Sequence, residues 1–133
     1  MDSDMFLYVS GWSYVAGFFD GEGSVVLVRS RWNGSEKVYP TINFTNTCND
    51  VVLWVKEFLE QYDITIHYRA KNRPTVNRLV VYELAISDKK SIMEFINHIR
   101  PYLKVKGDAV DNAAKVLKNN MTREEYWNRG RSA

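Results

Sequence analysis

The chain contains few residues that could form disulfides or zinc sites. Of its 133 residues, one is cysteine, Cys48, and two are histidine, His67 and His98. A single cysteine excludes an internal disulfide and is typical of proteins that work in a reducing, intracellular compartment. One cysteine and two widely separated histidines also argue against a structural zinc site. We expect Cys48 to be a buried, unreactive thiol, as free cysteines usually are.

Long apolar runs are also missing, and we expect no secretory leader. No run of about 18 apolar residues occurs, so we expect no membrane-spanning helix. Asp2 and Asp4 lie where a signal peptide would carry positive charge. With 45% hydrophobic residues, the sequence predicts a single globular domain over residues 1–133 that is intracellular and not bound to a membrane.

The net charge is low, at +2, but it is unevenly distributed along the chain. The strand-like segments 24–47 and 65–87 hold seven basic residues and two acids, Glu36 and Glu83, which gives these segments +5 and leaves −3 elsewhere. The seven basic residues are Arg29, Arg31, Lys37, Arg69, Lys71, Arg73 and Arg78. This asymmetry favours a positive face that binds nucleic acid. The simpler alternative is a solvated sheet surface.

The most informative segment is YVAGFFDGEGS, residues 14–24. The sequence predicts a helix over residues 12–19, with Val15, Phe18 and Phe19 at positions i, i+3 and i+4 on one side of it. This apolar stripe should pack against a core. The helix should then end in the glycine-rich turn that follows.

The same helix combines a face of small residues with an acidic end. Ser13, Ala16 and Gly17 carry little side chain and would let another backbone approach closely. Asp20 and Glu22 lie at the C-terminal end, where the helix macrodipole is already negative. Because stability alone would favour a basic residue there, two acids suggest a metal site.

The following residues predict a first β-hairpin. The apolar run 25–28 favours a strand over residues 24–32, and Asn33-Gly34 is a strong turn signal. In residues 37–47, apolar and polar residues alternate, which predicts one core face and one polar face. Pro40 lacks an N–H donor, so it should lie at an edge or a bulge of the sheet.

Alternating helices and strands continue to the end of the chain. The sequence predicts a helix over about 49–61, a second hairpin over 64–87 with its turn in 71–77, and helices over 88–101 and 107–121. Thr122–Glu125 reads as a capping box that would begin a last short helix. The resulting order, αββαββα with C-terminal helices, predicts an α+β fold with one twisted antiparallel sheet backed by helices.

Residues 15–23, VAGFFDGEG, resemble the nine-residue LAGLIDADG motif of homing endonucleases. The predicted order of elements resembles that family over about residues 8–120, followed by a helical tail over 121–133. The resemblance implies the homing-endonuclease fold with a saddle-shaped sheet. It also implies site-specific hydrolysis of both strands of a long, pseudo-palindromic double-stranded DNA target. Since the sequence contains one motif, the resemblance implies a homodimer.

The resemblance also assigns roles to individual residues. Glu22 matches the metal-binding acid, where many members carry Asp, and the carbonyl of Gly21 should help to hold Mg²⁺ (or Mn²⁺). Lys106 matches an active-site lysine near the scissile phosphate, and Asn46 matches a residue that orders water. Asp20 should be mainly structural, accepting backbone hydrogen bonds in the turn. The residues expected at the dimer interface are Ser13, Ala16, Gly17 and Asp20.

The sheet is expected to read the DNA. Residues 37–47 would span roughly 36 Å at ~3.3 Å per residue, which is about one duplex turn of ~34 Å. Arginine contacts to guanine and asparagine contacts to adenine are the expected form of base recognition. The candidates are Ser30, Trp32, Lys37, Tyr39, Thr41, Asn43, His67, Arg69, Lys71, Arg73 and Arg78.

Two other classes of function fit parts of the sequence. A protein of the same fold could serve as an RNA-splicing maturase, or bind DNA without cutting it, although the presence of both Glu22 and Lys106 weighs against lost cleavage. A small metal-dependent hydrolase acting on a soluble substrate would fit the acids but would leave the basic sheet unexplained.

Overall fold

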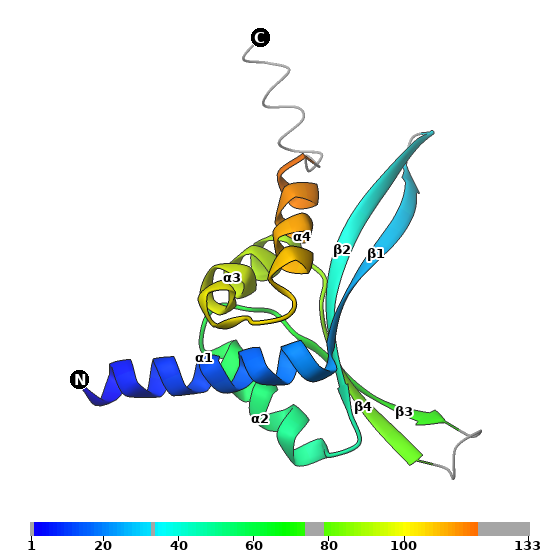
Figure 1. Cartoon of the computed structure of the whole chain (residues 1–133). Helices are drawn as coiled ribbons and strands as arrows, with labels where there is room; N and C mark the ends of the chain where they lie inside the picture. Colours follow the sequence, from blue (N-terminus) through cyan, green and yellow to red (C-terminus); the bar gives the residue numbers. More distant parts are fainter. Residues whose placement is uncertain (1, 33, 74–78, 120–133) are drawn as a thin grey trace.

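The computed structural model describes residues 2–32, 34–73 and 79–119, and it confirms the predicted αββαββα order (Figure 1). The elements are α1 (Ser3–Glu22), β1 (Gly23–Trp32), β2 (Ser35–Asn46), α2 (Asn49–Glu60), β3 (His67–Arg73), β4 (Leu79–Ile86), α3 (Lys89–Ile99), the short 3-10 helix η1 (Arg100–Tyr102) and α4 (Gly107–Asn119). The helix predicted to begin at Thr122 lies outside the described residues.

The first helix is longer than the apolar pattern predicted, because it begins at Ser3 and not at Trp12, and because residues 20–22, predicted to form a turn, are its last turn. The side chain of Asp2 accepts hydrogen bonds from two backbone N–H groups of the first turn, at 2.7 and 3.1 Å, and so caps the helix. The added turns project away from the sheet and expose Phe6 and Leu7 (Figure 1). In the described part of the chain, no helix has the length and apolar character needed to cross a membrane.

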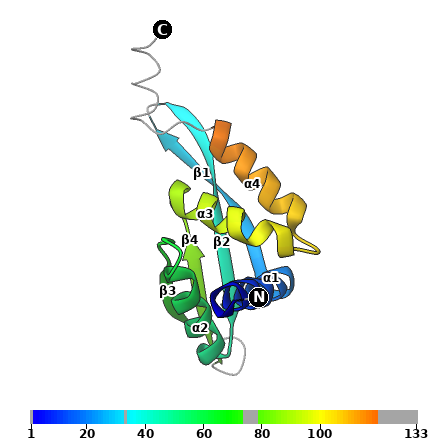
Figure 2. The same ribbon diagram turned by 90° about the vertical axis from the view of Figure 1, so that its left-hand side faces the viewer.

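The four strands form one antiparallel sheet in the order β1-β2-β4-β3. The predicted turn joins β1 to β2, with Gly34 at a φ of 75°. β2 pairs with β4 only from Ile42 to Asn46, so Pro40 lies on a stretch of β2 whose second edge has no β4 partner, as expected. The helices cover one face of the sheet (Figures 1 and 2). Both hairpins bend away from the helices, so the opposite face is concave (Figure 1).

Aromatic side chains fill the space between the helices and the sheet. The Phe19 ring of α1 packs against Phe44 of β2 and Phe95 of α3, with ring centroids 5.3 and 5.5 Å apart. All three residues are fully buried. Gly11 lets α1 approach α2 closely, because a Cβ at this position would lie 2.2 Å from the ring of Phe58. These contacts give the C-terminal end of α1 a defined position beside the sheet.

Candidate active site and nucleic-acid interface

The C-terminal end of α1 is tied to the loop that precedes α4. The Asp20 carboxylate accepts hydrogen bonds from the backbone N–H groups of Lys104 (2.7 Å), Val105 (3.1 Å) and Lys106 (2.9 Å). Partial burial raises the pKa of Asp20, but the three hydrogen bonds and the charge of Lys106 outweigh it and hold the pKa below its usual value. Asp20 therefore accepts backbone hydrogen bonds as expected, although from a distant loop and not from its own turn.

Lys106 supplies positive charge at the end of α1. Its Nζ donates hydrogen bonds to the carbonyl oxygens of Phe19 (2.9 Å) and Asp20 (3.0 Å). Because these carbonyls form the negative end of the helix dipole, the ammonium group stabilises them. The sequence argument took two acids at a helix end as a sign of a metal site. Lys106, 86 residues beyond Asp20, supplies positive charge there, so the helix dipole does not by itself indicate a metal.

Glu22 is the acid that remains free at this helix end. Gly21 and Glu22 close α1, and both are exposed. Within the part of the chain that the structure describes, the Glu22 carboxylate has no hydrogen bond or ion pair. That part also contains no cluster of three or more His, Cys, Asp or Glu side chains able to hold a metal. One chain therefore offers a cation one free carboxylate and one backbone carbonyl.

Asn46 lies at the end of β2 and shapes the connection to α2. Its Oδ1 accepts a hydrogen bond from the backbone N–H of Cys48 at 2.8 Å. No hydrogen bond in the described structure joins Asn46 to Asp20 or Lys106, so its water-ordering role stays a prediction. The same connection corrects the expectation for Cys48, which is exposed because it lies in a surface turn between two elements.

The exposed face of α1 lacks one of the residues that were expected at the dimer interface. Ser13 and Gly17 are exposed, as an interface requires. Ala16 is fully buried in the core of its own chain, so it has no surface left for a partner and is removed from the expected set. A Cβ at Gly17 or Gly21 would meet no atom within 4 Å. Among the described residues, therefore, no packing contact explains why these positions are glycine.

The concave face of the sheet carries most of the residues predicted to contact DNA. Ile42 and Phe44 are buried against the helices, so the alternate residues of β2 face the opposite way. Residues directly opposite one another on neighbouring strands share a face. The pairing places these predicted residues on the concave face: Ser30, Lys37, Tyr39, Thr41, Asn43, His67, Arg69 and Lys71. The side chains of Trp32 and Arg73, and all of Arg78, lie outside the described residues.

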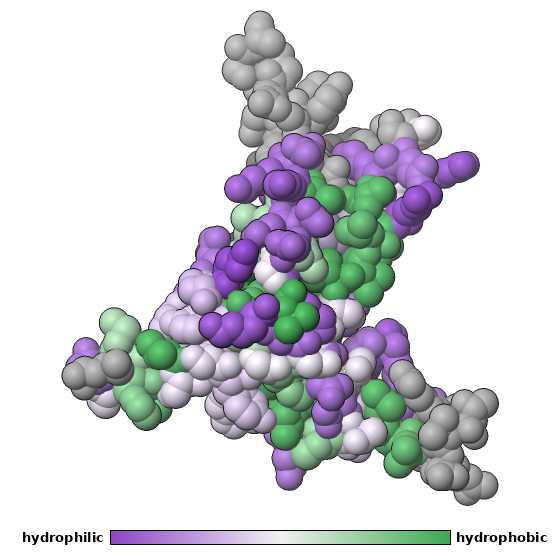
Figure 3. Space-filling model, in the orientation of Figure 1, coloured by the Kyte–Doolittle hydropathy of each residue, from purple (hydrophilic) through white to green (hydrophobic). Residues whose placement is uncertain are grey.

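The pairing also shows which residues of β1 belong to this face. Val26 and Val28 lie opposite polar-face residues of β2 and are 43% and 44% exposed. Arg29 lies on the helix-side face and forms an ion pair with Glu36 at 3.5 Å. The sequence could not separate these positions, because residues 25–28 are all apolar and do not alternate. Apolar residues gather over this hairpin in Figure 3.

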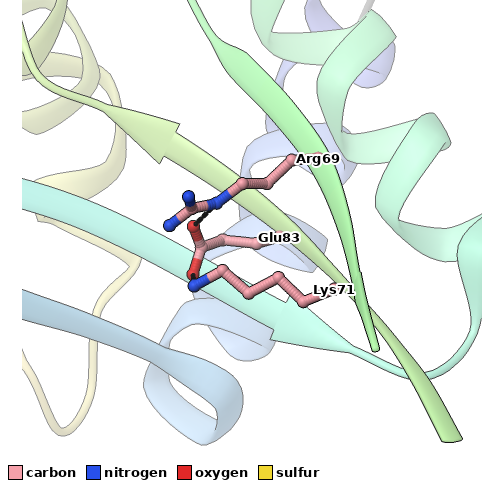
Figure 4. A network of polar contacts seen from close by, with 3 residues as sticks. All are labelled: Arg69, Lys71 and Glu83. Carbon is pink, nitrogen blue, oxygen red and sulfur yellow. Dashed lines mark hydrogen bonds and ion pairs between the residues drawn. The ribbon is translucent and has the colours of Figure 1, made fainter. Parts of the chain in front are cut away.

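At the centre of the concave face lies Glu83, which the sequence analysis treated only as one of two acids. Glu83 on β4 accepts a hydrogen bond from Arg69 Nε at 2.8 Å and another from Lys71 Nζ at 3.1 Å, both from β3 (Figure 4). Partial burial raises the pKa of Glu83, but the bonds and charges of Lys71 and Arg69 outweigh it and hold the pKa below its usual value. One feature of the sequence could have drawn attention to Glu83: it is an acid between Tyr82 and Leu84 in an otherwise apolar strand.

Comparison with known families agrees with this geometry. Residues 12–100, more than half of the chain, match the family model described as the LAGLIDADG-like domain. The chain therefore belongs to the LAGLIDADG family. None of the curated protein sequences matches it.

Solved structures of homing endonucleases share the fold. I-CvuI in complex with the I-CreI target aligns with a TM-score of 0.67 at 15% identity, covering 85% of this chain and 69% of that one. I-CvuI with its own target gives a TM-score of 0.66 at 14% identity, with the same coverage. I-GzeII in complex with its DNA target gives 0.61 at 18% identity and covers 81% of this chain, which spans only 35% of I-GzeII. These matches confirm the predicted homing-endonuclease fold.

Proposed function

We propose that this protein is a site-specific DNA endonuclease that acts as a homodimer and hydrolyses both strands of a long, pseudo-palindromic target with Mg²⁺ or Mn²⁺. The observation that carries the proposal is the joint position of Glu22 and Lys106, since Lys106 binds the two carbonyls that precede Gly21 and Glu22. Membership of the LAGLIDADG family supports it. The structures that share the fold are homing endonucleases with DNA targets, and I-CvuI was studied with Mg or Ca.

The oxygen atoms at the end of α1 fit a hard divalent cation. The Glu22 carboxylate and the Gly21 carbonyl are on an exposed turn of helix, whereas the Asp20 carboxylate is already used by three N–H groups. Mg²⁺ typically binds one or two carboxylates together with phosphate oxygens and water. One free carboxylate from each of two chains is therefore a sufficient protein contribution. A bound ion would supply a hydroxide nucleophile and stabilise the leaving 3′-oxygen.

Lys106 can act on the scissile phosphate from the position it holds. An ammonium group has three donors, and two of them bind the carbonyls of Phe19 and Asp20. The third N–H is available for a phosphate oxygen or for the attacking water, and its charge stabilises the negative transition state. The water oxygen bonds to phosphorus as the bond to the 3′-oxygen breaks, leaving a 5′-phosphate and a 3′-hydroxyl. Asp20 is a positioning residue, because it holds the loop that carries Lys106.

The exposed face of α1 supports a second copy of the chain as the partner. A glycine in the interior of a helix, such as Gly17, makes that helix less stable than alanine would, by roughly 0.5–1 kcal/mol. Close packing of two α1 helices would explain the missing side chain and would bring two Glu22 residues together. Tyr14 and Trp54 flank this face with exposed aromatic surface, their ring centroids 5.1 Å apart.

The substitution Gly17→Ala separates helix stability from dimerisation. Alanine should raise the thermal stability of the isolated chain because it favours the helix, yet it should weaken the dimer, as measured by light scattering over a concentration series. A wild-type chain that stays monomeric at micromolar concentration would contradict the proposed dimer.

Cleavage of a plasmid carrying the joined flanks of the coding region tests the proposed activity. The wild type should linearise it with Mg²⁺ and leave it intact with EDTA. Lys106→Met should cut about 100-fold more slowly while binding with similar affinity. Lys104→Met is the matched control, since the described structure uses this neighbouring residue through its backbone N–H. A wild type that binds the plasmid but never cuts would favour a non-cleaving protein of the same fold.

A further inference from the structure

An acid at the centre of the concave face works against the binding of DNA. Each phosphate carries negative charge, and basic residues gain affinity by replacing its counterions. Glu83 adds one negative charge to this face and lies among the residues expected to meet the DNA. The sheet itself does not require an acid here, because Val81 occupies the same face of β4 two residues earlier. The acid therefore needs an explanation beyond affinity and folding.

The hydrogen bonds of Glu83 restrict how Arg69 can meet a base. The carboxylate binds the Nε of Arg69, so the side of the guanidinium group that contains Nε is occupied. Its two terminal nitrogens belong to the same rigid fork. The side chain of Arg69 is 64% exposed, whereas that of Glu83 is 12% exposed. Arg69 can thus present only its terminal nitrogens, end-on, to an acceptor pair such as O6 and N7 of guanine.

Lys71 completes the arrangement by holding the second carboxylate oxygen. Its Nζ binds Oε2 while Arg69 binds Oε1, so both oxygens of Glu83 have donors (Figure 4). A carboxylate held at both oxygens is fixed in orientation, and so is the guanidinium group bound to it. Because both oxygens of Glu83 already accept hydrogen bonds, Glu83 is disfavoured as a direct reader of cytosine. The amino group of the base would have to displace Arg69 or Lys71.

From this geometry we propose that Glu83 is a specificity-determining residue. It orients Arg69 for end-on recognition of a guanine and at the same time lowers the sequence-independent affinity for DNA. The inference rests on the proposed binding of double-stranded DNA. Glu83 acts through Arg69 and is therefore a positioning residue.

Selection from a randomised duplex library tests this role. The probe is a pool of duplexes with roughly 24 random base pairs, enough for two successive turns, bound in Ca²⁺ and sequenced. The wild type should enrich one motif, and Arg69→Ala should lose the preference for one guanine per half-site. Glu83→Gln should lower the preference for guanine at the same base pair by about fivefold or more. Its affinity for a scrambled duplex should rise, with a salt slope steeper by about 0.9 per chain.

Glu36→Gln is the matched control. It removes the same charge from the ion pair with Arg29, on the helix-side face of the other hairpin, so it should leave base preferences unchanged and raise the affinity for the scrambled duplex by less than Glu83→Gln does. Arg69→Lys keeps the charge but lacks the fork, and should relax the same guanine as Glu83→Gln. If Glu83→Gln fails to fold, which thermal melting monitors, Glu83→Asp is the second variant: it keeps the charge but draws the carboxylate away from the Nε of Arg69, so it should relax the same guanine without raising the affinity for the scrambled duplex.

The outcomes separate this inference from the proposed function. If the wild type enriches a motif and a folded Glu83→Gln variant leaves that motif unchanged, orientation by Glu83 is wrong while DNA recognition stands. Relaxation of a different base pair from the one that Arg69→Ala relaxes would show that Glu83 reads a base itself, and would equally overturn the proposal. No enrichment by the wild type would overturn the proposed function and the inference with it.

Discussion

The two hairpins present different chemistry on the same concave face. In the first hairpin, β1–β2, Val26 and Val28 are exposed on this face and the ion pair of Arg29 lies on the other side. In the second hairpin, β3–β4, the ion pairs lie on the concave face itself and meet at Glu83. Each hairpin has one edge strand and one inner strand, so the difference comes from the side chains and not from the topology.

For a protein that reads DNA, this difference implies two kinds of recognition along one half-site. Exposed valines suit contacts with the methyl group of thymine, which involve no hydrogen bond. A guanidinium group held in place suits hydrogen bonds to guanine. The first hairpin would then recognise the methyl groups of thymine bases, and the second would recognise the hydrogen-bond donors and acceptors on the base edges.

The largest expected effect comes from removing the oriented arginine. Arg69→Ala should weaken binding to the preferred target by about 1–3 kcal/mol and relax one base pair. Lys37→Ala in the first hairpin should weaken binding to all sequences alike, with a salt slope smaller by about 0.9. Fluorescence anisotropy on matched and mismatched duplexes, at several salt concentrations, distinguishes the two. Equal loss of specificity in both variants would remove the distinction between the hairpins.

A smaller effect is expected in the apolar hairpin. Val26→Ser removes the methyl groups offered to thymine and should lower the preference for thymine by no more than about 1 kcal/mol, the lower end for a base contact. Leu27→Ser is the control, because Leu27 is also exposed but faces the helix side of the strand. Replacement of thymine by uracil in the duplex should reproduce the loss in the wild type and leave Val26→Ser unchanged. If Val26→Ser keeps the full preference for the methyl group, the first hairpin reads something else.

The smallest effect concerns acid stability. Since the folded pKa of Glu83 is depressed, its contribution to stability is fully present above the unfolded pKa and is lost as the pH falls through the folded pKa. The wild type should therefore lose more stability than Glu83→Gln when the pH falls below about 4.3, the ordinary value for glutamate. Urea unfolding of both proteins at neutral and acidic pH measures the difference. Equal losses would mean that the ion pairs of Glu83 contribute nothing to stability.

Local patterns in the sequence were enough to predict the order of the elements and the faces of β2. The alternation of apolar and polar residues around Ile42 and Phe44 correctly assigned the buried face, and the missing donor of Pro40 correctly placed it at an edge. The start of α1 was missed because its signal is a single capping residue, Asp2, ahead of a segment without clear apolar periodicity. Such features depend on neighbours within a few residues.

The site depended on contacts that no local pattern contains. Lys106 meets the end of α1 only because the core brings the two segments together, so the sequence assigned its role by resemblance alone. The burial of Ala16 depends on which side of α1 the core occupies. The partnership of Glu83 with Arg69 depends on the register of a hairpin whose turn length could not be predicted. Pairing between distant residues is what the sequence alone did not reveal.

The most direct test of the central claim is cleavage by Glu22→Gln, because this substitution removes the one free carboxylate at the end of α1 and preserves its shape. With Mg²⁺ and a plasmid carrying the target, the variant should bind as tightly as the wild type and leave both strands intact. Cutting by Glu22→Gln at the wild-type rate would contradict the account.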